Sequence, residues 1–297
     1  MENDIFVIGD LHIGDGGSRD NFGYPGSERP QQLNMFLDYI SKHEGELIIL
    51  GDLFEFWQTN FSRVMIKNMP LIERLGQLKP IYVIGNHDID LVGFIEHKLL
   101  QPNLFQNLSG PVVRKIGDKT FYFMHGHEVD PANSGETPGV GRVAAILGGI
   151  GEDLFGSPLL PNGQQVEVVL MKWVNYALGL WRLFLNWCKR KITKGKIPAP
   201  KSQLTPRQNP DREQEVLLCY KAHREENHYD AVIVGHTHKP GRIDNWYFNC
   251  GSWATSDNNF IRITPSGEVQ IFDWKNGQPV ANETVLTLPK VPKEATI

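Results

Sequence analysis

The chain alternates short, continuous apolar runs with longer segments in which apolar residues recur every three or four positions. The runs are rich in Val, Ile, Phe and Tyr, and they lie at residues 5–8, 47–50, 81–84, 121–124, 231–234 and 246–248. Continuous apolar runs of this length are typical of strands that are buried on both faces. Residues 30–44 and 211–227 instead have the spacing of helices. The alternation predicts a layered α/β architecture, with sheet inside and helices outside.

Polar side chains that can bind metal follow the predicted strands. The segments are GDLH at 9–12, GD at 51–52, GNHD at 85–88, HGH at 125–127 and GHTH at 235–238. In open α/β sheets, ligands bind just beyond the carboxyl ends of the strands. Asp, Asn and His suit Mn, Fe or Zn, and the absence of Cys from these segments argues against a structural zinc site. The sequence therefore predicts a metal site at one edge of the sheet.

Such a donor set is suited to phosphoryl chemistry. Two metal ions side by side bind phosphoryl oxygens and deprotonate a bridging water at neutral pH. A shared carboxylate is needed to hold both ions, and Asp52, alone after a central predicted strand, is the natural candidate. His87, beside Asn86, would then stabilise the transition state or protonate the leaving oxygen.

The five motifs, in this order over residues 9–238, resemble those of the calcineurin-like metallophosphoesterase superfamily. The resemblance implies a two-sheet β-sandwich flanked by helices, a single domain over residues 1–297, and two divalent metal ions. We expect Mn, with Fe or Zn as alternatives. By similarity, the first metal is bound by Asp10, His12, Asp52 and His238, and the second by Asp52, Asn86, His125 and His236. His87 is then the catalytic histidine.

One motif points to a branch of that superfamily. GDLFEFW at 51–57 resembles the UDP-2,3-diacylglucosamine hydrolases, pyrophosphatases of lipid A synthesis that act at the membrane surface. Phe54 and Trp57 are expected to place aromatic surface near the metals and substrate, unless they only pack the loop. Many of those hydrolases carry Arg at the position of His87, whereas His at this position is the pattern of general phosphoesterases.

The step from His125 to His236 is much longer than the preceding steps, which predicts an inserted helical lid and linker at 129–212. The lipid hydrolases named above carry a lid between the same two motifs. Within the insertion, residues 166–191 form an apolar helical pattern with a narrow polar stripe, and Lys and Arg inside it make a poor transmembrane span. Three alternatives stay open: contact with a membrane surface, packing within the lid, or a homo-oligomer interface.

Four further residues are candidates for substrate contact. Asp88 and His127 would either touch a substrate phosphate or orient a metal ligand. Arg19 and Asn21 belong to the Gly-rich loop 14–30, which follows the first predicted ligands. That loop would either contact substrate phosphate or form the rim of the site.

Composition narrows the cellular setting. The net charge of −4 gives no general attraction to nucleic acid. The three cysteines are far apart, which is typical of a reducing compartment. No signal-peptide pattern is visible at the N-terminus. These features predict a cytoplasmic protein without a nucleic-acid partner, and peripheral contact with the inner membrane face through residues 166–191 is one of the alternatives left open above.

The leading hypothesis is a binuclear phosphoesterase that cleaves a phosphodiester or pyrophosphate bond with metal-activated water. Its expected substrate is a phosphorylated small molecule or a lipid-linked one, with UDP-2,3-diacylglucosamine first. The first alternative is a soluble phosphomonoesterase or nucleotide phosphodiesterase. A second is a non-catalytic scaffold of the same fold, for which loss of ligands would be expected, whereas here every motif ligand is present.

Overall fold

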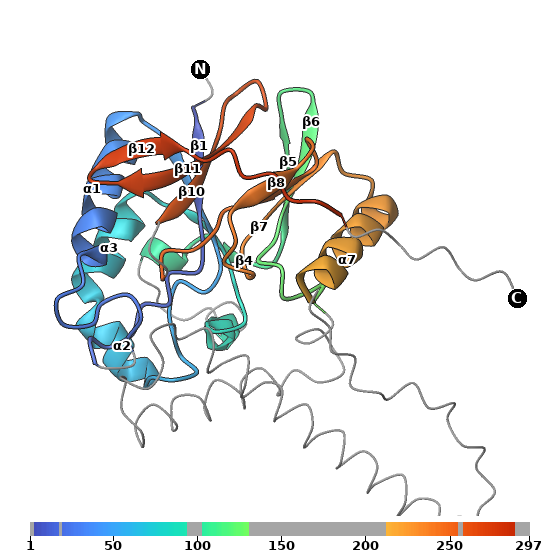
Figure 1. The fold of residues 1–297 in the computed structure, drawn as a ribbon. Coiled ribbons are helices and arrows are strands. Elements are labelled where there is room, and N and C mark those ends of the chain that lie inside the picture. Colours follow the sequence, from blue (N-terminus) through green and yellow to red (C-terminus); the bar gives the residue numbers. More distant parts are fainter. Residues whose placement is uncertain (1–2, 18–19, 94–102, 131–211, 255–257, 289–297) are drawn as a thin grey trace, which may run out of the picture. The chain divides into compact units, whose positions relative to one another are not determined.

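The computed structural model describes residues 3–17, 20–93, 103–130, 212–254 and 258–288. Within these ranges the strands form two sheets (Figure 1). The larger sheet has the order β12-β11-β10-β1-β2-β3-β4, with β1 (Ile5–Ile8), β2 (Glu46–Leu50), β3 (Ile81–Val83), β4 (Leu108–Ser109), β10 (Asn259–Ile263), β11 (Val269–Lys275) and β12 (Gln278–Ala281). The smaller has the order β5-β6-β7-β9-β8, with β5 (Val112–Ile116), β6 (Lys119–Phe123), β7 (Ala231–Val234), β8 (Gly241–Ile243) and β9 (Tyr247–Asn249). The helices are α1 (Arg29–Lys42), α2 (Phe61–Lys67), α3 (Met69–Gln77) and α7 (Arg212–Asn227), with short 3-10 turns η1 (Ile89–Leu91) and η2 (Asn103–Phe105).

The predicted α/β fold with a two-sheet sandwich is confirmed. The six apolar runs become β1, β2, β3, β6, β7 and β9, with bounds that differ by at most two residues. In the larger sheet β1, β2 and β3 are parallel, and in the smaller sheet β6, β7 and β9 are parallel. The sequence did not predict β4, β5, β8 or β10–β12. Most of these pair antiparallel with a neighbour, and several expose one face.

Strand β1 shows why a continuous apolar run was needed. Successive side chains of a strand point to opposite faces. Ile5 and Val7 pack between the two sheets, in one cluster with Phe121 of β6. Phe6 packs on the opposite face against Phe36 of α1. Both faces of β1 are therefore buried, and no position along it tolerates a polar side chain.

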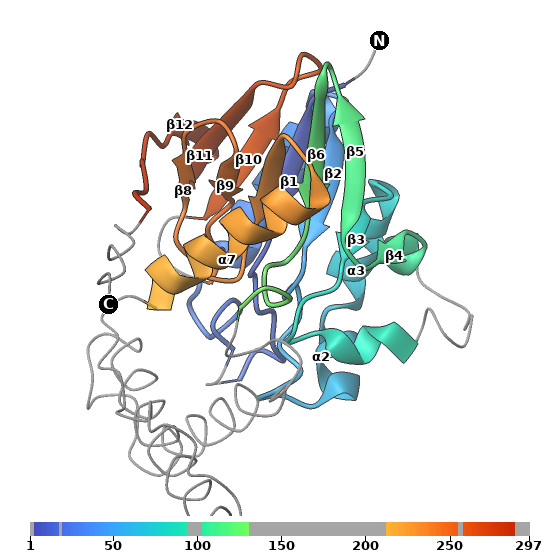
Figure 2. The same cartoon turned by 90° about the vertical axis from the view of Figure 1, so that its right-hand side faces the viewer.

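Helices cover the outer face of each sheet. The side chains of α1 and α3 pack in one core cluster with β1 and β2 of the larger sheet. Helix α7 packs against the smaller sheet, where Leu217 and Tyr220 join Val232 and Val234 of β7. Figure 1 shows α1 and α3 on one side of the sheets and α7 on the other, and Figure 2 shows α7 crossing the strands of the smaller sheet. The order of layers is thus helix, sheet, sheet, helix.

The insertion predicted at 129–212, including 166–191, lies outside the described residues except at its ends. Val129 and Asp130 close the described segment after β6, and α7 begins at Arg212. No helix in the described ranges has both the length and the apolar character needed to cross a bilayer.

Candidate metal centre

The predicted ligands lie at the carboxyl ends of strands from both sheets. Parallel strands end at a common edge, so β1, β2 and β3 bring their following loops together, and so do β6 and β7. The larger sheet supplies Asp10, His12, Asp52 and Asn86, and the smaller sheet supplies His125, His236 and His238. Side chains from both layers of the sandwich therefore meet at one edge.

The backbone is bent in an unusual way at most of these ligands. Five of them have a positive φ in the left-handed region: Asp10 (54°), His12 (50°), Asp52 (49°), His236 (67°) and His238 (58°). Asp and His adopt this conformation more readily than most non-glycine residues, but still at some cost in free energy. Backbone strain of this kind concentrates at functional sites, where the surrounding fold holds it.

Two glycines let the carboxylates approach the neighbouring backbone. A Cβ at Gly85 would collide with Asp52 Oδ1, and a Cβ at Gly235 would collide with Asp10 Oδ2. Because these atoms lie so close, the two carboxylates accept nearby backbone N–H groups, of His87 at 2.8 Å and of His236 at 2.9 Å. Each carboxylate is thereby fixed by a motif from another strand.

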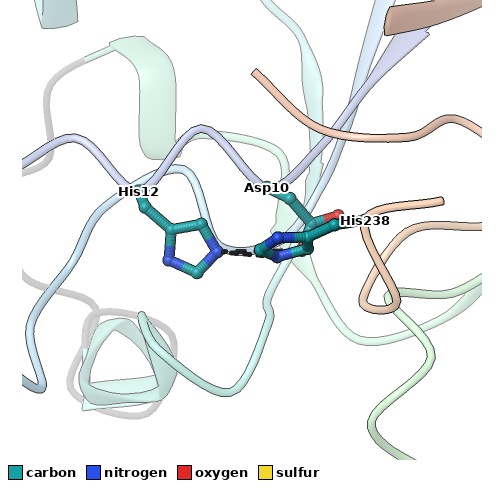
Figure 3. Close-up of side chains that lie close together, drawn as sticks. All are labelled: Asp10, His12 and His238. Carbon is teal, nitrogen blue, oxygen red and sulfur yellow. Dashed lines mark hydrogen bonds and ion pairs between the residues drawn. The ribbon is translucent and has the colours of Figure 1, made fainter. Parts of the chain in front are cut away.

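Asp10, His12 and His238 form a first group of metal-binding atoms (Figure 3), which lie within 4.8 Å of one another. His12 Nε2 is 3.1 Å from His238 Nε2, and His238 Nε2 is 3.2 Å from Asp10 Oδ1. Asp10 Oδ1 is buried and has no hydrogen-bond partner in the described chain. A buried carboxylate oxygen facing two imidazole nitrogens is an arrangement that a cation would satisfy.

A second group contains Asp10, Asp52 and His125, all of them buried. His125 Nε2 lies 3.2 Å from Asp52 Oδ2 and 3.1 Å from Asn86 Oδ1. Asp52 Oδ2 is also 3.8 Å from His12 Nε2, so this carboxylate lies beside both groups. That is the position predicted for the ligand shared by two ions.

The Nδ1 nitrogen of two predicted ligand imidazoles is occupied, which directs Nε2 of each to the metal centre. His125 Nδ1 donates to the carbonyl of Leu50 at 2.7 Å, which leaves its Nε2 as the nitrogen that can bind metal. His12 Nδ1 lies 3.1 Å from Glu55 Oε2, which directs its Nε2 to the first group in the same way. Such second partners are characteristic of histidines that bind metal.

His236 is held differently. Its Nε2 lies 2.8 Å from Asp130 Oδ2, and Asp130 is buried. Any metal bond from His236 therefore requires Nδ1. His236 belongs to neither of the two groups of metal-binding atoms described above.

The charged side chains of this cluster shift one another's pKa values. Burial alone would raise the pKa of Asp52, but the positive charges of His125 and His87 outweigh it and hold this pKa well below the usual range. Burial likewise opposes a charged His87, but the carboxylates of Glu55 and Asp52 raise its pKa to about 9. Divalent cations bound here would take the place of such protons as partners of the carboxylates.

Residues 4–240 match the family model described as calcineurin-like phosphoesterase, which is well over half of the chain. The chain belongs to this family. No curated protein gives a match to it.

Solved structures that resemble this chain are distant. Vacuolar protein sorting 29 from Cryptosporidium parvum is 13% identical, with 94% of this chain and 95% of that chain covered and a TM-score of 0.40. Wild-type Vps29 complexed with zinc, from Entamoeba histolytica, is 14% identical, with coverage of 94% and 97% and a TM-score of 0.41. An archaeal phosphodiesterase is 13% identical, with coverage of 91% and 99% and a TM-score of 0.41. The family assignment rests on the sequence match and not on these structures.

Divalent metals are the cofactors typical of a calcineurin-like phosphoesterase, and the residues present fit them. The buried Asp10 Oδ1 and the facing nitrogens of His12 and His238 provide three donor atoms for one ion. Asp52, His125 and Asn86 provide oxygen and nitrogen donors for another. Donors of this type suit several divalent metals, so the identity of the metal stays a prediction.

His87 lies beside this centre but is held from two sides. Its Nδ1 is 2.7 Å from Glu55 Oε2, and its ring stacks on Trp57 with centroids 3.9 Å apart and an interplanar angle of 21°. One ring nitrogen of His87, one of His12 and a carboxylate oxygen of Asp52 also lie within 4.8 Å of one another. The structure therefore places His87 beside His12 and Asp52, two predicted ligands of the first metal, in a fixed orientation.

Two other predicted contact residues are buried in the fold. Asp88 Oδ1 accepts from the backbone N–H of Gly85 at 2.7 Å, and Oδ2 accepts from that of Leu53 at 2.9 Å and from the Tyr82 hydroxyl. Asp88 thus joins the loops that carry Asp52 and Asn86, which supports its alternative role in orienting ligands. Phe54 is fully buried in the core and stacks on Phe56, which supports the alternative that it packs the loop.

The other residues predicted to contact substrate do not lie together. His127 lies beside the second group, with ring centroids 5.4 Å from His125. Asn21 is exposed, and its carbonyl accepts from Arg29 at 2.7 Å. Arg19 lies outside the described residues. Asp20 between them is buried and accepts backbone N–H groups of Gly16, Phe22 and Gly23, so it shapes the loop from within.

The sequence did not predict two residues that contact the candidate site. Glu55 touches both His12 and His87, and Asp130 touches His236. Glu55 was visible inside GDLFEFW, where an acidic residue between aromatic ones is a signal for a buried, partnered carboxylate. Asp130 had no local signal, because its partner lies more than a hundred positions along the chain.

Proposed function

We propose that this chain is a binuclear metal-dependent hydrolase of phosphodiester or pyrophosphate bonds. The observation that carries the proposal is the convergence of Asp10, His12, Asp52, His125 and His238 at one sheet edge, in a chain of the calcineurin-like phosphoesterase family. Two divalent ions held by these residues would supply Lewis-acid stabilisation of phosphoryl oxygens and a metal-activated water.

The residues of the chain would perform the remaining steps. Asp52, between the two groups, would hold both ions at a fixed separation. The carboxylates around His87 favour its protonated form, and a protonated imidazole beside the metals can donate to the leaving oxygen or to a phosphoryl oxygen. Trp57 covers one face of that ring and restricts its rotation.

An amphipathic substrate is our first choice within this class. The GDLFEFW motif and the apolar pattern at 166–191 support UDP-2,3-diacylglucosamine or a similar lipid-linked diphosphate. The same pattern supports peripheral contact with the inner face of a membrane, and Mn is the metal we expect. These parts of the proposal rest on sequence.

One observation favours a second candidate, a soluble phosphomonoesterase or nucleotide phosphodiesterase. This chain retains His87, which is typical of general phosphoesterases, and not the Arg of many lipid hydrolases. A non-catalytic scaffold is less favoured, because the ligand set and His87 are all present and His87 is held in place by Glu55 and Trp57.

The test is hydrolysis of UDP-2,3-diacylglucosamine by Mn-loaded protein in mixed micelles, followed by release of UMP. We expect metal-dependent release that Asp52→Ala abolishes by removing the shared ligand, and that His87→Ala lowers by about 10²-fold or more with little loss of bound metal.

Each alternative has its own outcome. Absence of UMP from a protein that still cleaves bis(4-nitrophenyl) phosphate would sink the lipid substrate and leave the soluble candidate. Inactivity towards all phosphoesters, with metal bound, would favour the scaffold. Wild-type turnover by Asp52→Ala would refute the shared-ligand role.

A further inference from the structure

The segment that follows β9 contacts two of the loops that carry predicted ligands, although none of its own residues was predicted as a ligand. Strand β9 pairs parallel with β7, with Asn249 opposite Val234, so the two strands end at the same edge of the sheet. The backbone N–H of Cys250 donates to the carbonyl of Val234 at 2.8 Å. Residues 249–254 therefore begin beside GHTH at 235–238.

Asn249 holds the loop that carries His236 and His238. Its side chain is fully buried, and its Nδ2 donates to the carbonyl of Gly235 at 2.7 Å and to Thr237 Oγ1 at 3.0 Å. Each acceptor belongs to the residue immediately before a histidine. Both histidines have a positive φ, so the loop depends on bonds from outside it to keep this conformation.

The other end of the segment holds Asp10. The carbonyl of Asp10 accepts from the Ser252 hydroxyl at 2.8 Å. It also accepts from the backbone N–H groups of Trp253 at 3.1 Å and Ala254 at 3.3 Å. Asp10 has a positive φ as well, and these donors fix the direction of its carbonyl. The Trp253 ring is fully buried beside Phe36, with centroids 5.2 Å apart, so the donors are anchored in the core.

A tight turn connects the two ends of the segment. Gly251 has a φ of 73°, and a Cβ there would collide with Asn259 Oδ1. Its backbone N–H donates to Asn249 Oδ1 at 2.8 Å, so the amide of Asn249 serves as donor and acceptor at once. The connection from Asn249 to Ser252 is therefore short and held by its own hydrogen bond.

We propose that residues 249–254 form a clamp that sets the separation of Asp10 and His238 at the first predicted metal. Asp10 follows a strand of the larger sheet and His238 a strand of the smaller, and His238 Nε2 lies 3.2 Å from Asp10 Oδ1 (Figure 3). Asn249 and Ser252 are then positioning residues for that ion. The proposal rests on the metal centre of the proposed function, but not on its substrate.

The first measurement is calorimetric titration of metal-free protein with Mn²⁺. We expect Asn249→Ala and Ser252→Ala each to weaken binding by about 10–100-fold, which is typical for residues that support metal ligands. The smaller loss belongs to Ser252→Ala, because the Asp10 carbonyl keeps two backbone donors. Wild-type affinity in either variant would overturn the proposal.

Two control variants separate this effect from general changes in the fold. Ser41→Ala removes a hydroxyl that donates to the carbonyl of Leu37 at 2.9 Å, shortly before β2 begins and so at the opposite edge of the sheet. It should leave the Mn²⁺ affinity unchanged. Ile72→Ala removes a buried side chain of α3 and should lower the urea midpoint without loss of affinity. A loss of affinity in Ile72→Ala equal to that of the clamp variants would show that metal binding only follows stability, and would overturn the proposal.

Electron paramagnetic resonance identifies which ion is lost. Two Mn²⁺ ions that share the carboxylate of Asp52 are spin-coupled, whereas a single bound ion gives the hyperfine pattern of isolated Mn²⁺. At a Mn²⁺ concentration that just saturates the wild type, we expect Ser252→Ala to show the isolated pattern, because Asp52 and His125 still hold the second ion. Loss of both ions in parallel would contradict a clamp on the first.

The double variant tests whether Asn249 and Ser252 act through one connection. A break at either end releases the same link, so Asn249→Ala with Ser252→Ala should weaken binding less than about 3-fold beyond the more affected single variant. Losses that multiply in full would show two independent effects and overturn the clamp.

The outcomes distinguish this proposal from the proposed function. A wild type that binds no Mn²⁺ would overturn both. A wild type that binds two ions no more tightly than its clamp variants would overturn the clamp alone. Should Asn249→Ala fail to fold by circular dichroism, the affinity and the spectrum of Ser252→Ala decide.

Discussion

At the residue scale, two fully buried tyrosines differ in whether the hydroxyl group is hydrogen-bonded, and this difference gives a prediction. The Tyr82 hydroxyl donates to Asp88, whereas the Tyr220 hydroxyl has no hydrogen-bond partner in the described part of the chain. Tyr82→Phe should lower the free energy of unfolding by about 1–3 kcal/mol, because Asp88 loses a donor. Tyr220→Phe should be neutral or stabilising, because it removes an unsatisfied group. Urea unfolding of both variants checks the difference, and equal losses would contradict it.

Sequence predicted the residues of this site far better than their partners. Asp10, His12, Asp52, His125 and His238, which the structure brings together, were predicted because a ligand after a strand end carries its signal in a few consecutive letters. The roles of Glu55 and Asp130 depend on which residues the fold brings within about 3 Å, and that information is spread over the whole chain. The same holds for Asp88. Its burial and its three hydrogen-bond donors indicate a structural role, which its position in GNHD did not reveal.

At the scale of elements, substitutions in α1 test whether its buried side chains hold this helix on the larger sheet. Phe36 is fully buried, and its ring centroid lies 4.8 Å from that of Phe260 and 5.2 Å from that of Trp274. Its neighbour Met35 is 38% exposed. Phe36→Ala should lower the free energy of unfolding by about 3–5 kcal/mol through the cavity that it leaves. Met35→Ala should change it by less than about 0.5 kcal/mol. Chemical unfolding of both variants measures this, and similar values would show that the stripe does not hold the helix.

Strands that are buried on both faces were predicted from the sequence, whereas strands with one solvent-exposed face were not. Strands β1, β2 and β7 read as unbroken apolar runs because sheet and helix cover them from both sides. Strand β11 has the sequence VQIFDWK, in which polar residues interrupt the apolar ones because part of one face meets solvent. Strand β4 spans only two residues, too few for any period to appear. The central strands, and with them the site, were therefore more predictable than the edges.

At the scale of the whole molecule, the candidate centre joins two separately built halves. The larger sheet supplies Asp10, His12 and Asp52, and the smaller supplies His125 and His238, so ions bound between them would connect the layers of the sandwich. The unfolded chain holds these ligands apart, so metal binds the native state almost exclusively. Metal affinity is then also a contribution to the stability of the fold.

Metal should therefore raise the melting temperature of the protein. At a free Mn²⁺ concentration of about 100 times Kd, binding adds about 2.7 kcal/mol to the free energy of unfolding. For a chain of this size, that corresponds to a rise in Tm of roughly 4 °C over protein treated with EDTA. Asp52→Ala is the control, because it lacks the carboxylate between the two groups and its Tm should respond far less. A wild-type Tm that is the same in EDTA and in Mn²⁺ would show that these residues do not hold metal in the native state.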